Sequence, residues 1–174
     1  MRIFLIFVLS IVPLFSKVKL NEQQISNLKI VRAVALNYTN NDGESFPNTI
    51  ASICMTESSG GIKLYGDLDK KNGKYYSSLG AMQIRVPTAR YVSSLYPKEL
   101  SDIYVLTDRQ LRKRLLRDIA FSAKIASLYI VHLSNTRKNY FQTVSGYNGG
   151  LINKKYYTTV MKWNGILKDM KINF

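Results

Sequence analysis

Glu57 is the residue whose type and position most clearly suggest chemistry. It follows Ile50 by seven residues and Ile53 by four, so on a helix the three side chains share one face. The segment 58–61, Ser-Ser-Gly-Gly, ends that helix, which puts Glu57 near the negative end of the helix dipole. Burial and the dipole both disfavour the ionised form, so we expect a raised pKa and a general acid. The alternative at this point is a surface glutamate at a frayed helix end.

The other acidic residues offer Glu57 few partners. Only Asp67 and Asp69, in the loop that follows, lie near it in the sequence. Enzymes that cleave glycosidic bonds commonly pair two carboxylates, and either aspartate can supply the second. Residues 66–73 also invite a calcium interpretation, but Asn72 stands where an EF-hand loop requires glycine. We therefore interpret this segment as a solvated loop.

Metal and thiol chemistry are disfavoured by composition. The chain has one cysteine, Cys54, and one histidine, His132, whereas zinc and iron sites need clusters of such ligands. A single cysteine also excludes an internal disulfide, so stability must come from packing. His132 lies within an apolar helical pattern, where a structural or surface role is the simpler interpretation. We expect no metal and no cofactor.

The elements that must position Glu57 are mostly helices joined by loops rich in Gly, Asn and Asp. Alternating strand patterns are rare, apart from short extended pieces near residues 75–85. Apolar spacing, Pro47 at a helix start and a capping box at Thr107 and Gln110 set the expected boundaries. The expected helices cover residues 21–38, 45–57, 88–96, 107–133 with a break near 117–118, and 153–170, with a polar loop at 62–79 and a turn at 148–150.

Length and charge bound the class of protein. With 174 residues, of which 46% are hydrophobic, the chain suits one domain with a proper core. Lys and Arg number 25 against 11 Asp and Glu, a formal charge of +14. Such an excess favours polyanionic partners, namely nucleic acid, an anionic membrane or an acidic polymer. A solvated basic surface is the equally simple alternative.

The N-terminus predicts export. Met1-Arg2 precedes an uncharged apolar run from Ile3 to Phe15, which is shorter than the ~20 residues that span a bilayer. A short basic start and an apolar run of this length are typical of a signal peptide, here residues 1–16, leaving a catalytic domain at 17–174. An uncleaved anchor and a buried helix are the alternatives. Export to the periplasm or cell envelope favours an envelope polymer over nucleic acid as the partner of the positive charge.

Three segments, in order, are similar to those of one enzyme family. The first is 53–60 (ICMTESSG), the second is 80–84 (GAMQI) followed by Thr88-Ala89, and the third is 145–150 (SGYNGG) followed by Tyr156. They resemble the Glu-Ser, Gly-Leu-Met-Gln and Tyr-Asn-x-Gly motifs of SLT-type lytic transglycosylases. The resemblance covers roughly residues 50–160 and implies a mainly α, lysozyme-like fold with a groove and little or no β-structure.

The resemblance also implies an activity. Lytic transglycosylases cleave the β-1,4 bond between N-acetylmuramic acid and N-acetylglucosamine in peptidoglycan and form a 1,6-anhydro sugar. By analogy Glu57 is the single catalytic acid and base. The substrate-binding residues that the resemblance implies are Ser58, Ser77, Ser78, Met82, Gln83, Tyr147, Asn148 and Tyr156. For the two loop serines, the sequence does not decide which one touches substrate.

The chain departs from the family pattern at a few positions. Ala81 stands where the family has Leu, and Ser122 and Ala126 stand where its helix has Asn and Gly. The interval of 26 residues between Glu57 and Gln83 is longer than in typical members. None of these departures removes a catalytic group.

Rival functions remain open on sequence grounds. A hydrolytic lysozyme would use Asp67 or Asp69 to position water, and a peptidoglycan-binding scaffold would need no acid at all. We expect a monomer that acts on peptidoglycan strands, without nucleic acid. Such a small enzyme suits local wall opening by a secretion, conjugation or phage apparatus as well as general turnover, and the sequence does not choose among these.

Overall fold

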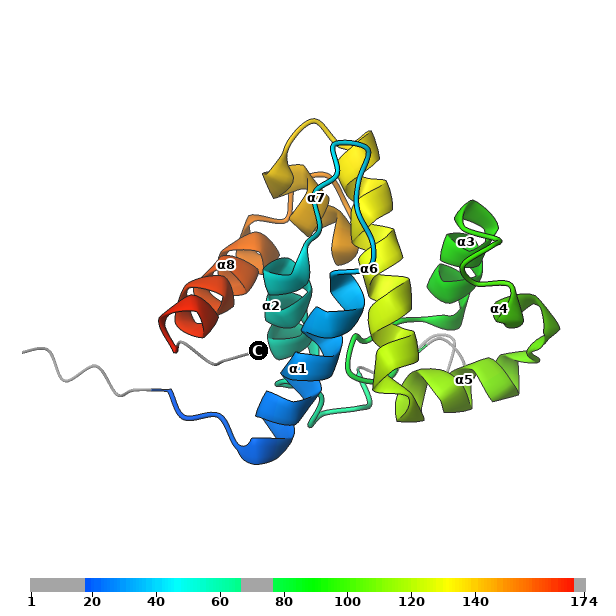
Figure 1. Ribbon diagram of the computed structural model, residues 1–174, viewed down its shortest axis with the longest axis horizontal. Helices are drawn as coiled ribbons and strands as arrows, with labels where there is room; N and C mark the ends of the chain where they lie inside the picture. The colour runs from blue at the N-terminus through cyan, green and yellow to red at the C-terminus, as the bar shows by residue number, and fades with distance from the viewer. Residues whose placement is uncertain (1–17, 67–76, 171–174) are drawn as a thin grey trace, which may run out of the picture.

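Helix α6 organises the fold, because most of the other helices pack against it, whereas α8 packs on α2 and α7 (Figure 1). The computed structural model describes residues 18–66 and 77–170. In Figure 1, α1, α2, α7 and α8 lie on one side of α6, and α3, α4 and α5 lie on the other. The helices are α1 Glu22–Ala35, α2 Pro47–Ser58, α3 Val86–Leu95, α4 Asp102–Val105, α5 Asp108–Arg117, α6 Ile119–Thr136, α7 Tyr140–Tyr147 and α8 Lys154–Asp169.

The predicted mainly α fold class is confirmed. Within the described ranges, extended pairing is confined to isolated bridges, and no sheet forms. Two of these bridges pair Leu79 with Tyr65 and with Ile84, within the region where short extended pieces were expected. They close a tight turn immediately before α3, and this turn carries Gln83.

Local signals explain most of the helix boundaries. Asn21 and Gln24 form a reciprocal capping box at the start of α1, and Thr107 and Gln110 form the expected one at α5. Asp118 ends α5 and its side chain accepts a hydrogen bond from Phe121 N, which starts α6. The predicted break near 117–118 is therefore confirmed, and it lets α6 change direction relative to α5.

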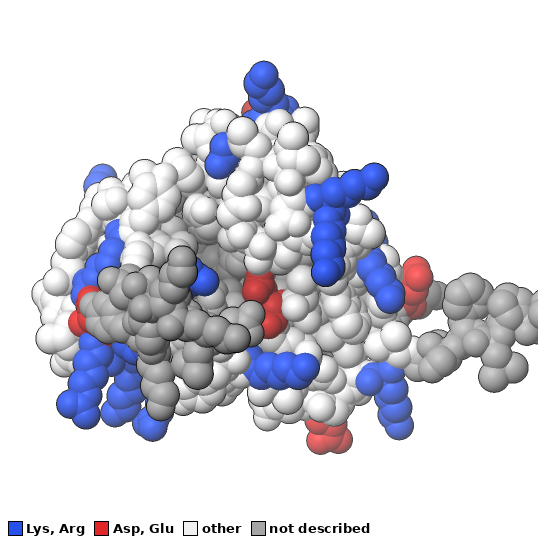
Figure 2. Space-filling view, turned by 180° about the vertical axis from the view of Figure 1, so that it is seen from behind, with Lys and Arg blue, Asp and Glu red and all other residues white. Residues whose placement is uncertain are grey.

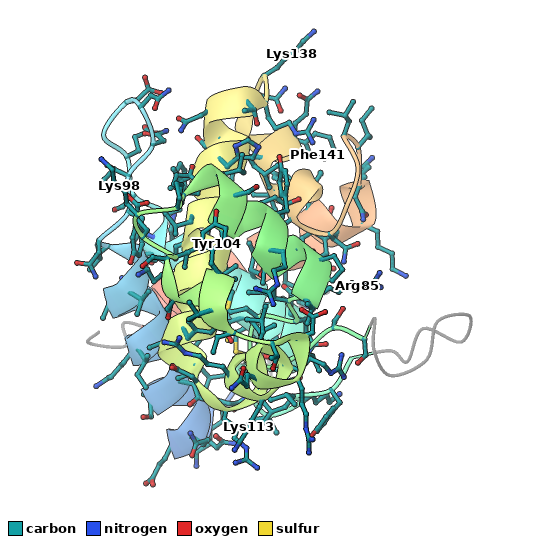
Figure 3. All side chains as sticks on the ribbon, turned by 90° about the vertical axis from the view of Figure 1, so that its right-hand side faces the viewer. Arg85, Lys98, Tyr104, Lys113, Lys138 and Phe141 are labelled. Atoms are coloured by element: carbon teal, nitrogen blue, oxygen red, sulfur yellow. The ribbon has the colours of Figure 1, made fainter. Side chains whose placement is uncertain are left out.

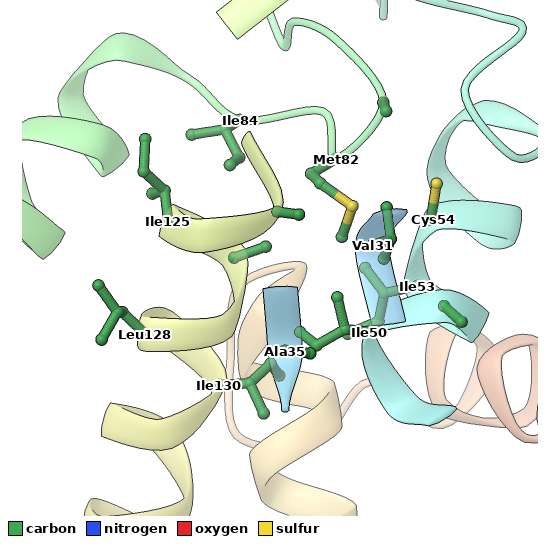
Figure 4. Packing of buried hydrophobic residues seen from close by; sticks show 14 of the residues in the cluster. Val31, Ala35, Ile50, Ile53, Cys54, Met82, Ile84, Ile125, Leu128 and Ile130 are labelled. Carbon is green, nitrogen blue, oxygen red and sulfur yellow. The ribbon is translucent and has the colours of Figure 1, made fainter. Parts of the chain in front are cut away.

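The core joins α1, α2 and α6 beneath the turn that precedes α3 (Figure 4). Ile50, Ile53 and Met82 have no exposed surface. Burying an isoleucine or methionine side chain contributes about 1.5–3 kcal/mol relative to leaving it exposed. These contacts hold the end of α2 and the Met82-Gln83 segment against each other, so the residues they carry have fixed positions.

Candidate active site

Glu57 lies where the periodicity predicts, in the last turn of α2. Pro47 occupies the first turn of this helix. Ile50 and Ile53, which share a helix face with Glu57, are fully buried in the core. The helix ends on Ser59, which adopts the left-handed conformation with φ 54°, and Gly60 and Gly61 continue with positive φ. The segment 58–61 ends the helix, as predicted. The left-handed cap position itself belongs to Ser59, and the glycines complete the turn.

A cavity of about 300 Å³ opens beside Glu57. Its walls come from the end of α2, the turn before α3, the start of α3, the middle of α6 and the end of α7. Figure 2 shows this face hollowed, with acidic side-chain atoms near the middle and basic side chains around it. Residues that line the cavity include Glu57, Ser78, Gln83, Arg85, Thr88, Tyr129, Tyr147 and Asn148.

The environment of Glu57 favours its protonated form. Burial raises the pKa of the carboxyl above its ordinary value of 4.5. Two hydrogen-bonding side chains, Tyr156 and Asn148, act in the opposite direction and lower it. The Tyr156 hydroxyl donates to Glu57 Oε1 at 2.7 Å. Because burial is the larger effect, the pKa of Glu57 remains raised, as the sequence predicts.

Tyr156 therefore acts on Glu57 directly, from α8. The tyrosine is 8% exposed and does not line the cavity, so we interpret it as a positioning residue and not as the substrate-binding residue that the resemblance implies. Its hydroxyl stabilises the ionised carboxylate. Without this hydroxyl, the pKa of Glu57 should rise further.

Tyr156→Phe should accordingly shift the pH dependence of activity. Glu57 must be protonated to act as an acid, so the alkaline limb of the kcat/KM profile should move to higher pH. Rates measured across the pH range on one substrate test this. Tyr157→Phe is the matched control, because that neighbouring ring packs on Phe141 and its hydroxyl makes no hydrogen bond to the described residues. An alkaline limb that stays in place, or moves to lower pH, would contradict the role of Tyr156.

Gln83 lines the cavity as predicted, but most of its amide is already engaged. Its Nε2 donates to the Gly80 carbonyl at 2.8 Å and to the Lys63 carbonyl at 3.2 Å. Its backbone has φ 49°, a left-handed conformation that costs free energy for a non-glycine residue. The surrounding turn holds this strained residue beside Glu57, so Gln83 presents a pre-set polar wall.

The end of α7 places Tyr147 and Asn148 at the same cavity. The Tyr147 hydroxyl donates to the Met82 carbonyl at 2.8 Å, and its ring lies 5.7 Å from that of Tyr129. Tyr147 thus ties α7 to the turn before α3 and forms part of the cavity wall. Asn148 is exposed, and its Oδ1 accepts a hydrogen bond from Asn153 at 3.1 Å. That bond orients the amide group, whose nitrogen can donate a hydrogen bond to Glu57 or to a ligand.

Ser58 is a structural residue. The resemblance implies that Ser58 binds substrate, but this residue has no exposed surface and does not line the cavity. Its Oγ lies 2.6 Å from the Ala81 carbonyl oxygen and accepts from Gly61 N at 2.8 Å. These bonds fasten the end of α2 to the turn that carries Gln83.

Ser58→Ala should lower stability without a specific defect in substrate binding. The buried Ala81 carbonyl and the partly buried Gly61 N–H would each lose a partner, which costs about 1–3 kcal/mol for a fully buried group and less for a partly buried one. Urea unfolding of the variant checks this loss. Ser94→Ala is the control, because Ser94 makes only a local bond on the exposed side of α3. If the variant were as stable as the wild type but bound substrate more weakly, Ser58 would have to be returned to the binding residues.

Met82 and Ser77 also lie away from the cavity. Met82 has no exposed surface and belongs to the core, although its carbonyl accepts the Tyr147 hydrogen bond. Ser77 is 3% exposed and its Oγ accepts a hydrogen bond from Arg112 at 3.4 Å. Of the two loop serines, only Ser78 lines the cavity. Asp67 and Asp69, the candidate second carboxylates, lie outside the described residues.

Several lining residues were missed as site residues. Thr88 belongs to a segment that carried the resemblance, and Tyr129 follows Ala126 by three residues, but their place in the cavity depends on how α3 and α6 pack. Arg85 gave no signal beyond its position two residues after Gln83. These three residues add an aromatic, a hydroxyl and a cation to the site.

Other chemistry finds little support in the described ranges. No group of three His, Cys, Asp or Glu side chains there lies close enough together to hold a metal ion. His132 instead contacts Tyr91, whose hydroxyl lies 3.1 Å from Nε2, outside the cavity lining. Burial and Arg137 lower the pKa of His132.

None of the described helices combines the length and apolar character needed to span a membrane. The candidate signal peptide, residues 1–16, lies outside the described residues.

Comparisons with family models, with curated proteins and with solved structures found no match to this chain. The resemblance to lytic transglycosylases therefore stays a prediction.

Proposed function

We propose that this protein is a peptidoglycan lytic transglycosylase in which Glu57 is both acid and base. The observation that carries the proposal is the cavity with one carboxyl among its described lining residues, a carboxyl that burial keeps protonated to higher pH. A general acid in a sugar-sized cleft suits glycosidic bond cleavage.

The proposed reaction needs no second carboxylate. Glu57 donates its proton to the oxygen that bridges the muramic acid and glucosamine residues, and the bond from that oxygen to C1 breaks. The Glu57 carboxylate then takes the proton of the C6 hydroxyl of the same muramic sugar, whose oxygen closes onto C1. Because the nucleophile belongs to the substrate, its effective concentration is high. The product is a 1,6-anhydro sugar, and Glu57 ends protonated as it began.

The other lining residues suit a glycan. The Asn148 amide can form a hydrogen bond with the acetamido group of the sugar at the cleavage point. That acetamido group would in turn stabilise the positive charge that develops on the sugar. Tyr129 and Tyr147 offer aromatic surface for a sugar ring, and Gln83 and Ser78 offer polar groups. We also propose an exported protein, because the polymer that this cavity suits lies outside the cytoplasm.

Digestion of purified peptidoglycan tests the proposal. Mass spectrometry of the released fragments should find anhydro-muramic ends, which lack one water relative to reducing ends. Reducing ends would instead indicate a hydrolytic lysozyme. The absence of any released fragment from clean, folded protein would leave a binding or scaffold role and end the proposal of an enzyme.

A further inference from the structure

Arg85 stands out among the lining residues because it is a cation with no acidic partner in the described part of the chain. No ion pair within residues 18–66 and 77–170 involves it, whereas Arg90 and Arg114 are held by Asp108, Asp102 and Asp118. Its one recorded side-chain bond runs from Nε to Ser78 Oγ, at 3.4 Å. The guanidinium therefore keeps most of its donors for another group.

The backbone fixes the point from which Arg85 extends. Ile84 and Val86, on either side, are 4% and 2% exposed, whereas Arg85 itself is exposed. Figure 3 shows Arg85 at the start of α3, well separated from Lys98 and Lys138. The buried neighbours hold the chain while the side chain stays free to reach a ligand, so its place at the cavity wall follows from the core.

Arg85 and Glu57 share the cavity without neutralising each other. The groups that shift the pKa of Glu57 are its burial, Tyr156 and Asn148, and Arg85 is not among them. A guanidinium in contact would favour the ionised carboxylate. The cavity thus combines an acid at one place with an uncompensated positive charge at another, which suits a substrate that carries a negative charge at some distance from the bond to be cleaved.

We propose that Arg85, supported by Ser78, binds a carboxylate of the glycan strand and makes the site select acidic, muramic-type strands over neutral ones. This inference rests on the proposed function. The guanidinium fork matches a carboxylate with two parallel hydrogen bonds. The carboxylate can come from two sources, the lactyl group of the muramic sugar or the peptide stem attached to it, and both present the same chemistry.

Three forms of one substrate separate these sources. The first is strands with peptide stems. The second is strands freed of stems, in which the lactyl carboxylates are exposed. The third is the stem-free strands with those carboxylates converted to neutral amides. Arg85→Gln is compared with Arg85→Lys, which keeps the charge but not the fork, and with Lys138→Gln, which removes an exposed charge away from the cavity.

Arg85→Gln should lower kcat/KM on carboxylate-bearing strands by about ten- to a hundredfold, the worth of a charge-assisted hydrogen bond. Arg85→Lys should retain part of the activity, and Lys138→Gln all of it. On the amidated strands Arg85→Gln should equal the wild type. A loss on stem-free strands identifies the lactyl carboxylate, and a loss confined to strands with stems identifies the stem. If Arg85→Gln cleaved all three forms as fast as the wild type does, the inference would be overturned. The same would follow if Arg85→Gln lost activity equally on all three forms.

A binding measurement keeps this test separate from the proposed function. Strand affinity is measured for Glu57→Gln and for the double variant with Arg85→Gln, neither of which is expected to cleave. Weaker binding of charged strands by the double variant, with unchanged binding of amidated strands, supports the role of Arg85 even if the wild type proves inactive. Identical affinities for charged strands would refute it even if the wild type forms anhydro products.

Discussion

Glu57→Gln should abolish strand cleavage while leaving the fold intact. The amide has the shape of the carboxyl and can still accept the hydrogen bond from Tyr156, but it can neither donate a proton to the glycosidic oxygen nor take one from the C6 hydroxyl. Loss of a general acid and base lowers rates by about 10²- to 10⁴-fold. The measurement is the rate of fragment release from purified peptidoglycan. Glu99→Gln is the control, because Glu99 is exposed and lies outside the cavity lining.

The same variant provides a check that needs no substrate. A carboxyl whose pKa is raised in the folded protein binds its proton more tightly there than in the unfolded chain. Its contribution to stability is complete below the ordinary value of 4.5 and is lost as the pH rises through the raised value. Glutamine does not ionise, so the free energy of unfolding of Glu57→Gln should increase relative to that of the wild type as the pH rises above 4.5. If the difference in free energy of unfolding between the variant and the wild type became smaller as the pH rises, the proposed role of Glu57 would be contradicted. Cleavage by the variant near the wild-type rate would contradict it as well.

Gly80→Ala should be the most destabilising of the substitutions considered. Gly80 has φ +72°, and an added Cβ would lie 1.9 Å from the carbonyl oxygen of Leu115. That oxygen belongs to α5 and also accepts a hydrogen bond from Ser122 at 2.8 Å, so it cannot easily move away. The left-handed conformation alone costs a non-glycine residue about 1–3 kcal/mol, and the backbone collision adds to it. We expect a loss of about 3 kcal/mol or more, or failure to accumulate folded protein.

Gly43→Ala is the matched control for that substitution. Gly43 has a similar φ of +79°, but an added Cβ would meet no atom within 4 Å. Gly43→Ala should therefore lose only the conformational cost, about 1–3 kcal/mol. Urea unfolding of both variants separates backbone strain from close approach. If the two variants lose the same stability, the contact between Gly80 and α5 does not constrain the turn that carries Gln83.

Most helices that depend on local signals could be predicted from the sequence, but α7 was not among the expected helices, although the side chain of Asn139 caps its first turn. Apolar spacing and Pro47 gave α2, and the Thr107 capping box gave the start of α5. The short α4 was not predicted, because a single turn has little propensity of its own. The helix is stabilised by Arg90 of α3, whose guanidinium donates hydrogen bonds to the carbonyls of Ile103, within α4, and Leu106, at its end. No local pattern announces such a contact.

The candidate site divides in the same way. Glu57, Gln83, Tyr147 and Asn148 were predicted, and the structure brings them to one cavity. The periodicity of α2 accounts for Glu57, but motif order alone could not tell a lining residue from its buried support. Ser58, Ser77, Met82 and Tyr156 do not line the cavity.

Arg85 could not be found from the sequence, because an exposed arginine among 25 basic residues carries no signal. Only the packing of α3 beside α6 shows that it faces the cavity. The sequence therefore indicates which group does the chemistry more reliably than which groups select the substrate.

The proposed role of Glu57 requires its carboxyl to be protonated at a pH where ordinary glutamates are ionised. The most direct measurement is an NMR titration of the side-chain carboxyl carbons of the four glutamates. The Glu57 resonance is assigned by its loss in Glu57→Gln. We predict a midpoint clearly above the ordinary value of 4.5, and a further rise in Tyr156→Phe. A midpoint at or below the ordinary value would mean that Glu57 is ionised and cannot be the acid proposed here.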